Sequence, residues 1–120
     1  MTYLIKVEKN TLNINNIAVQ FTGNIAEFKE INQQIIVRLD IPTTGFLTDN
    51  DFKNVYAIDV KGKIKWQIQN VRPVNNPNFQ CAPIVNIQVL DDNLFVTDFM
   101  GRKYNVDIDT GNMNLKTVTK

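Results

Sequence analysis

The sequence predicts an all-β fold, an antiparallel meander in which residues 1–120 form a single domain. Three observations support this prediction. One strand–turn–strand pattern recurs at a spacing of 39 residues, apolar and polar residues alternate in most segments, and glycines separate the alternating runs. With 43% hydrophobic residues, a chain of this length can form one core without disulfides.

The repeated units begin near residues 15, 54 and 93 and are NNIAVQFTGN, NVYAIDVKGK and NLFVTDFMGR. Alternate side chains of a strand point to one face, so each copy places three residues together. These trios are Ile17, Val19 and Phe21; Tyr56, Ile58 and Val60; and Phe95, Thr97 and Phe99.

A second strand is expected after the glycine of each later copy. In the second copy, Ile64, Trp66 and Ile68 alternate with polar residues. In the third copy the apolar positions, residues 104, 106 and 108, lie one residue out of phase with them. We therefore expect a β-bulge in the third copy.

The remaining elements follow from the same alternation. Residues 24–33 fit either a strand or a short helix capped by Asn24, and the neighbouring segments favour the strand. Further strands are expected over residues 4–8, 35–41, 84–90 and 114–119.

Turns and loops are marked by Gly, Pro, Asn and Asp. Hairpin turns are expected at Gly62, Gly101 and Gly111, because glycine readily adopts the positive φ that tight turns require. Residues 42–53 and 70–83 are predicted to be long loops.

The stretches NVYAIDVKGKIKWQI and NLFVTDFMGRKYNVDIDTGNM resemble the blades of quinoprotein-type (PQQ-like) β-propellers. Trp66 stands where such blades carry Trp, and Asn105 replaces it in the third copy. The chain, including IIVRLDIP at residues 35–42, is also similar to small uncharacterised proteins of Firmicutes-type bacteria. The resemblance implies two to three propeller-blade-like repeats, too short for a complete propeller ring. It implies no function, because propellers serve unrelated roles.

The composition excludes several kinds of catalytic site. The chain has no His and no Ser, which excludes a Ser-His-Asp triad. Cys81 is the single Cys, so the usual zinc sites are also excluded, and we expect Cys81 to be a small buried apolar residue. There is no Gly-rich phosphate loop, and no cofactor is predicted.

Paired carboxylates could support glycoside hydrolysis, although their position in predicted turns favours a structural role. The triplet DTG, residues 109–111, matches the catalytic triplet of aspartic proteases, but only nine residues follow it. The segments DND and DIDTGN hint at calcium without completing an EF-hand loop. The candidate pairs are Asp49 and Asp51, Asp91 and Asp92, and Asp107 and Asp109.

A basic strip is the candidate partner-binding surface. Lys63, Lys65 and Gln67 are expected on the solvated face of their strand, and Arg102 aligns with Lys63 in the third copy. A solvated strand face would have the same pattern. The aromatic residues that could line a ligand pocket are more simply explained as core residues; they are Tyr56, Trp66, Phe95 and Phe99.

These observations predict a non-catalytic module that binds another protein, of immunity or inhibitor type. A net charge of +1 argues against nucleic-acid binding, and charges in the first nine residues argue against a signal peptide. A cytoplasmic location without membrane contact is expected. The alternatives are a small-ligand or glycan-binding protein, a carboxylate-based hydrolase, and a structural subunit that completes a propeller by self-association as a homo-oligomer.

Overall fold

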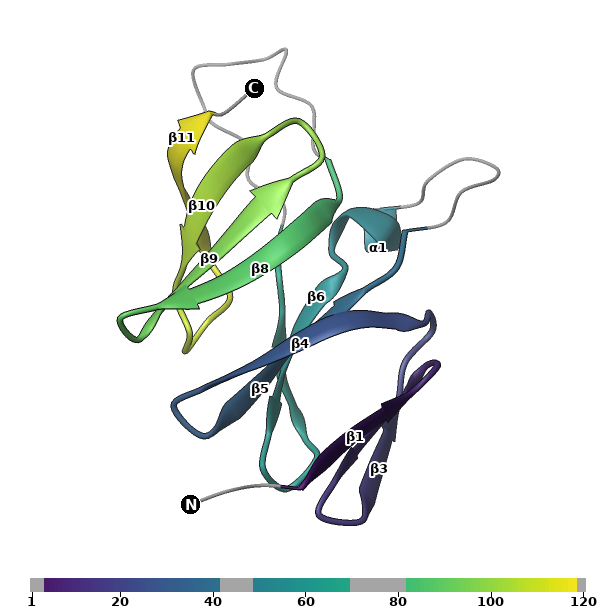
Figure 1. Ribbon diagram of the computed structural model, residues 1–120. Coiled ribbons are helices and arrows are strands. Elements are labelled where there is room, and N and C mark those ends of the chain that lie inside the picture. Colours follow the sequence, from purple (N-terminus) through teal and green to yellow (C-terminus); the bar gives the residue numbers. More distant parts are fainter. Residues whose placement is uncertain (1–3, 42–48, 70–81, 119–120) are drawn as a thin grey trace.

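The computed structural model describes residues 4–41, 49–69 and 82–118 (Figure 1). These residues form three antiparallel sheets, and neighbours in each sheet are consecutive in the chain. The fold is therefore the all-β meander that the sequence predicts. In the described part of the chain, no sheet closes into a barrel. No helix among these residues is long and apolar enough to span a membrane.

The three sheets follow one another along the sequence, with one short helix before β6. Sheet A contains β1 (Ile5–Glu8), β2 (Thr11–Ile14) and β3 (Ile17–Gln20). Sheet B contains β4 (Ile25–Ile31), β5 (Gln34–Leu39), β6 (Val55–Asp59) and β7 (Ile64–Gln67). Sheet C contains β8 (Ile84–Leu90), β9 (Asn93–Asp98), β10 (Arg102–Val106) and β11 (Met113–Val118). The helix is α1 (Asp49–Phe52).

Most of the predicted strands are present. Residues 24–33 contain strand β4, so the strand interpretation is confirmed and the helical alternative is wrong. Strand β2 was not predicted. Residues 42–53 were expected to be a loop, whereas the last part of that segment contains α1. Cys81 and most of the predicted loop at 70–83 lie outside the described residues.

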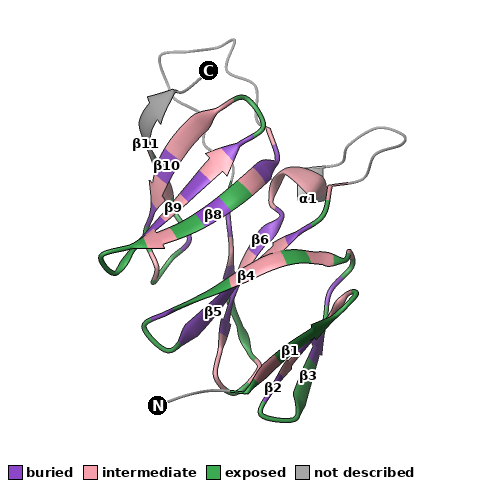
Figure 2. Ribbon diagram, in the orientation of Figure 1, coloured by how far each residue is buried: buried purple, intermediate pink, exposed green. Residues whose placement is uncertain are grey.

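Sheet B is the central layer, with sheet A on one side and sheet C on the other (Figure 1). Strand β5 is buried on both faces (Figure 2). Its Ile35 and Val37 pack with Leu12 and Ile14 of sheet A, while Ile36 belongs to the cluster shared with sheet C. Because one strand supplies both hydrophobic clusters, the three layers pack as one stack.

The glycine turns occur where they were expected. Gly62, Gly101 and Gly111 have φ of 85°, 83° and 81°. Three other hairpins turn on pairs of residues with positive φ, which is typical of type I′ turns; this turn type was not predicted. These pairs are Asn15 and Asn16, Asn32 and Gln33, and Asp91 and Asp92.

Two of the glycine turns also pack against the preceding sheet. A Cβ at Gly62 would lie 2.6 Å from Ile17 Cγ2, on β3. A Cβ at Gly111 would lie 2.6 Å from Cε3 of Trp66, whose indole N–H donates to Ile108 O at 2.8 Å. Glycine is therefore required at both turns by close packing as well as by φ.

The repeated units differ in their tertiary context. The first copy contains no hairpin at Gly23, because the chain there crosses from β3 in sheet A to β4 in sheet B. In the second copy, Ala57 pairs with Trp66 and Ile58 with Ile64, so the bulge lies at Lys65. The third copy pairs β9 with β10 in unbroken register. The sequence correctly predicted a β-bulge that separates the two copies in phase. The bulge lies in the second copy, however, and not in the third copy, where it was expected.

Three predicted apolar faces are also wrong in part, and in the first trio Ile17 is 41% exposed. Ile64 is exposed, because the bulge at Lys65 breaks its alternation with buried Trp66. In β9 the buried face consists of Leu94, Val96 and Asp98 instead of the predicted trio at 95, 97 and 99. The side of this strand that carries the aromatic Phe95 is therefore not the side that faces the core.

Candidate functional site

The second and third repeats share one turn, in which an Asp carboxylate caps the backbone. Asp59 Oδ1 accepts hydrogen bonds from the N–H groups of Lys61 and Lys63, both at 2.9 Å. Asp98 Oδ1 accepts from Met100 and Arg102, both at 3.0 Å. Asp59 and Asp98 are thus turn residues.

The carboxylate of Asp98 makes two further contacts. Asp98 is buried, and its Oδ2 accepts from Arg102 Nε at 2.7 Å and from Tyr104 Oη at 2.8 Å. The hydroxyl of Tyr104 is buried as well. Charge-assisted hydrogen bonds of this kind are stronger than neutral ones. The β9–β10 turn is therefore held by one carboxylate at four points.

This turn presents two large apolar side chains to solvent. Phe99 is 72% exposed and Met100 is 58% exposed. The equivalent residues of the second repeat are Val60 and Lys61. The expectation that Phe99 is a core residue was wrong, because the strand ends at Asp98 and the chain turns there. We call Phe99 and Met100 the turn tip.

The predicted basic strip is not brought together as a single surface. Lys63 and Lys65 are exposed on the β6–β7 side of sheet B. Gln67 Nε2 instead donates to Lys53 O at 2.8 Å and to Tyr56 Oη at 3.1 Å. Arg102 lies in sheet C, where it is paired with Asp98.

The four aromatic candidates likewise do not converge on one pocket. Tyr56 packs on Phe21 with ring centroids 5.2 Å apart, in the cluster between sheets A and B. Trp66 belongs to the cluster between sheets B and C. Phe95 lies beneath Lys103 Nζ, at 4.8 Å from the ring centroid, and Phe99 is at the turn tip. The core interpretation holds for Trp66, and Tyr56 is only partly buried.

The candidate carboxylate pairs lie in turns or in the short helix, and those in turns serve the local backbone structure. Asp91 and Asp92 form the β8–β9 turn. Asp107 Oδ1 accepts from the N–H of Asp109 at 2.9 Å, which confirms that DTG is part of a hairpin turn. Asp49 and Asp51 belong to α1. Among the described residues, no three His, Cys, Asp or Glu side chains gather as metal ligands do.

The turn at Asp59 predicts a pH dependence. The N–H of Lys63 is the main cause that lowers the pKa of Asp59 below its ordinary value of 3.8, and Lys61 acts in the same direction. A lowered pKa stabilises the fold above the ordinary value, and this stabilisation is lost as pH falls through the folded pKa. We therefore expect Asp59→Asn to be less stable than the wild type at neutral pH and equally stable in strong acid, measured by urea unfolding.

The control for this prediction is Asp40→Asn, which removes an exposed carboxylate outside the turn. It should change the pH profile less than Asp59→Asn does. An NMR titration midpoint for the Asp59 carboxyl at or above 3.8 would contradict the prediction.

The fold and the turn tip define a small all-β protein of three stacked antiparallel sheets that presents apolar residues on a hydrogen-bonded turn. Residues 2–118 match the family described as a domain of unknown function (DUF7957), and the chain belongs to that family. A search of the curated proteins finds no match.

Proposed function

We propose that the protein is a non-catalytic module that binds another protein through the turn tip. The observation that carries this proposal is the exposure of Phe99 and Met100 next to each other on one turn. Aromatic residues and Met are enriched where proteins bind each other. Exposing both side chains contributes nothing to the core, which is consistent with a role in recognition.

The rigidity of the turn supports the same proposal. Ordering a mobile loop on binding costs free energy, and a turn that is already ordered avoids that cost. Asp98 holds the backbone N–H groups of Met100 and Arg102, and Phe99 N–H donates to Pro83 O at 2.9 Å. The turn tip is thus anchored on both sides.

The experiment is affinity capture with the wild-type chain and with the double variant Phe99→Ser/Met100→Ser. We expect a protein retained by the wild type to bind the double variant at least about 30-fold more weakly, since truncating even one hot-spot residue costs about 2 kcal/mol. The folded state should be unaffected, because both side chains are exposed. Equal denaturation midpoints would verify this.

The control variant is Ile64→Thr, which removes an apolar side chain that is 51% exposed on β7. It should retain the partner. Equal retention by the wild type and the double variant would overturn the proposal. The immunity or inhibitor form of this function makes a narrower prediction, namely that the captured protein is an enzyme whose activity falls on binding.

A further inference from the structure

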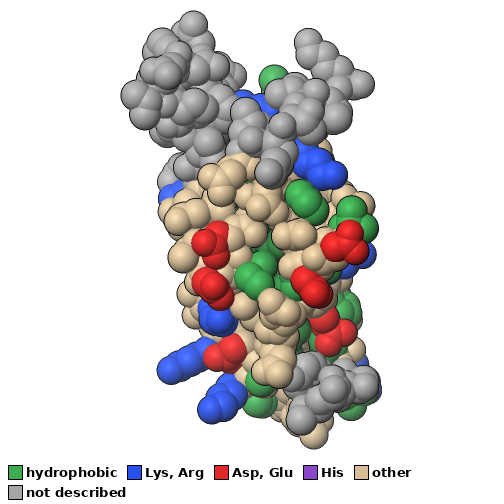
Figure 3. Space-filling model, turned by 90° about the vertical axis from the view of Figure 1, so that its left-hand side faces the viewer, with side chains coloured by type: hydrophobic (Ala, Val, Ile, Leu, Met, Phe, Trp, Pro, Cys, Tyr) green, Lys and Arg blue, Asp and Glu red, His purple; other side chains and the backbone are tan. Residues whose placement is uncertain are grey.

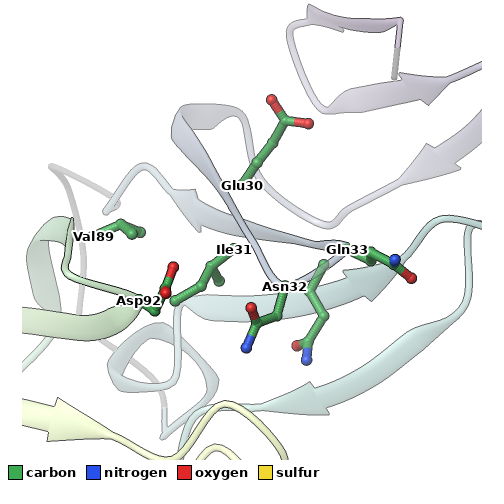
Figure 4. Close-up of a pocket in the computed structure, with 7 residues that line it drawn as sticks. Glu30, Ile31, Asn32, Gln33, Val89 and Asp92 are labelled. Carbon is green, nitrogen blue, oxygen red and sulfur yellow. The ribbon is translucent and has the colours of Figure 1, made fainter. Parts of the chain in front are cut away.

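A cavity of about 320 Å³ lies where the β4–β5 turn meets the end of β8 and the β8–β9 turn. Figure 3 views this side of the molecule and shows acidic side chains on both sides of a small apolar patch. In the close-up of Figure 4, Asp92 and Asn32 lie on either side of Ile31, and the Glu30 carboxylate points away from them. The cavity lining therefore combines the Asp92 carboxylate with amide side chains and an apolar surface.

Gln34 lines this cavity and is the unusual group in it. The residue is only 5% exposed, and its Oε1 is buried with no hydrogen-bond partner among the described residues. Buried acceptors without a donor are rare, because each costs about 1–3 kcal/mol. A donor supplied by a ligand would remove this cost.

The electrostatics of the region favour a positively charged donor. Asp92 lines this cavity and also a second one of about 350 Å³, to which Asp107 contributes. None of the described residues that line the two cavities is Lys or Arg. A cation entering here meets carboxylate and amide oxygens without a competing internal cation.

The apolar part of the cavity suits an alkyl chain. Ile31 is almost completely buried, and Val89 packs against the same hydrophobic cluster. Long basic side chains place their methylene groups on such surfaces and keep the charged end on polar groups. Arginine fits better than lysine, because its planar guanidinium has five N–H donors that can reach a carboxylate and an amide oxygen together.

The strands and turns on both sides of the cavity are fixed by hydrogen bonds and by tight turn geometry. Glu27 Oε2 accepts from Arg38 Nε at 2.6 Å and from the N–H of Ile87 at 3.2 Å, which joins β4 and β5 to β8. Asn32 and Asp92 adopt positive φ within their tight turns. Such an arrangement lowers the ordering cost of binding.

We propose that this cavity binds an arginine side chain of a protein partner, with the guanidinium donating to Asp92 and Gln34 Oε1. The proposal rests on the protein-binding function proposed above and assigns a second contact to it. The cavity and the turn tip involve different residues. Loss of one contact can therefore be measured separately from loss of the other.

The test is an NMR titration of the ¹⁵N-labelled chain with a capped Gly-Arg-Gly peptide. We expect saturable shifts at Val89, Asp92 and the Gln34 side-chain amide, with a dissociation constant on the order of millimolar for one side chain. The matched probe has citrulline in place of arginine, which keeps the shape and removes the charge. It should bind at least about tenfold more weakly.

Two variants separate recognition from folding. Asp92→Asn should weaken peptide binding about tenfold, and Glu8→Gln, the charge-matched control on β1, should not. Gln34→Met replaces the amide, whose Oε1 has no hydrogen-bond partner among the described residues, with an apolar side chain of similar length. It should raise the denaturation midpoint while weakening peptide binding, a combination that a purely structural role for Gln34 does not produce.

Three results would overturn the inference: no saturable shift at the cavity, equal binding of the citrulline peptide, or unchanged arginine binding by Gln34→Met. None of these three results would affect the capture experiment, which tests the turn tip independently. Conversely, arginine binding by the cavity together with full retention by the Phe99→Ser/Met100→Ser variant would place recognition at the cavity instead of the turn tip.

Discussion

Replacing Asp98 with Ala is expected to lower the free energy of unfolding by about 3–5 kcal/mol. The substitution removes the carboxylate that accepts from Arg102 Nε and Tyr104 Oη and from two backbone N–H groups. Because the site is buried, water cannot replace these acceptors fully. Urea unfolding followed by circular dichroism measures the loss.

The chain contains a matched control for this prediction. Asp59 occupies the same place in the second repeat and caps its turn with the same two backbone bonds. However, it is partly exposed, and the two N–H donors are exposed as well. We expect Asp59→Ala to cost about 1 kcal/mol. Equal losses at the two positions would show that the contacts to Arg102 and Tyr104 add little stability.

Asn54→Ala is expected to lower the free energy of unfolding by about 2–4 kcal/mol. Buried Asn54 bridges sheets B and C: its Nδ2 donates to Leu39 O and Ile84 O, and its Oδ1 accepts from Ile84 N–H, each at 2.9 Å. Removing the amide leaves three buried backbone groups without these partners. The loss is measured by the same unfolding experiment.

Two further variants test the role of the Asn54 amide itself. Asn93 is the repeat equivalent, but it is exposed and bonds only locally to Asp91 O, so Asn93→Ala should change stability by no more than about 0.5 kcal/mol. Asn54→Asp keeps the acceptor for Ile84 N–H and places a carboxylate against two carbonyl oxygens. It should be at least as destabilising as Asn54→Ala, and a milder effect would contradict the bridging role.

Local features of the fold could be predicted from the sequence. The glycine turns at 62, 101 and 111 were found because each requires a positive φ. A turn was expected at Asp91 and Asp92, but the type I′ geometry of this turn and of the other two was not predicted, although Asn and Asp tolerate positive φ.

The burial of individual strand faces could not be predicted in the same way. In β9, Phe95 is larger than Leu94 and Val96, yet the smaller residues face the core. Alternation shows that a strand has two faces, but the neighbouring sheet determines which face is covered. Strand β5 is covered on both faces, because it lies in the middle layer.

The candidate sites also depend on tertiary contacts that the sequence does not reveal. Lys63 and Arg102 align in the repeats but lie in different sheets, so their similarity in sequence gives no shared surface. The turn tip was missed because Phe99 continues the alternation of β9 past the end of the strand. The unpartnered Oε1 of Gln34 has no sequence signal at all, because hydrogen-bond satisfaction depends on atoms from several elements.

By itself, the sequence determined the all-β class, the meander of short strands and most of the turns, since these depend on residues near each other in the chain. Only the tertiary structure decided the order of the three layers, the bridge from Asn54 to β8 and the exposure of Phe99 and Met100. The physical reason is that burial and long-range hydrogen bonds are set by whichever sheet packs on a residue. That neighbour can lie 30 positions away, as Ile84 does from Asn54.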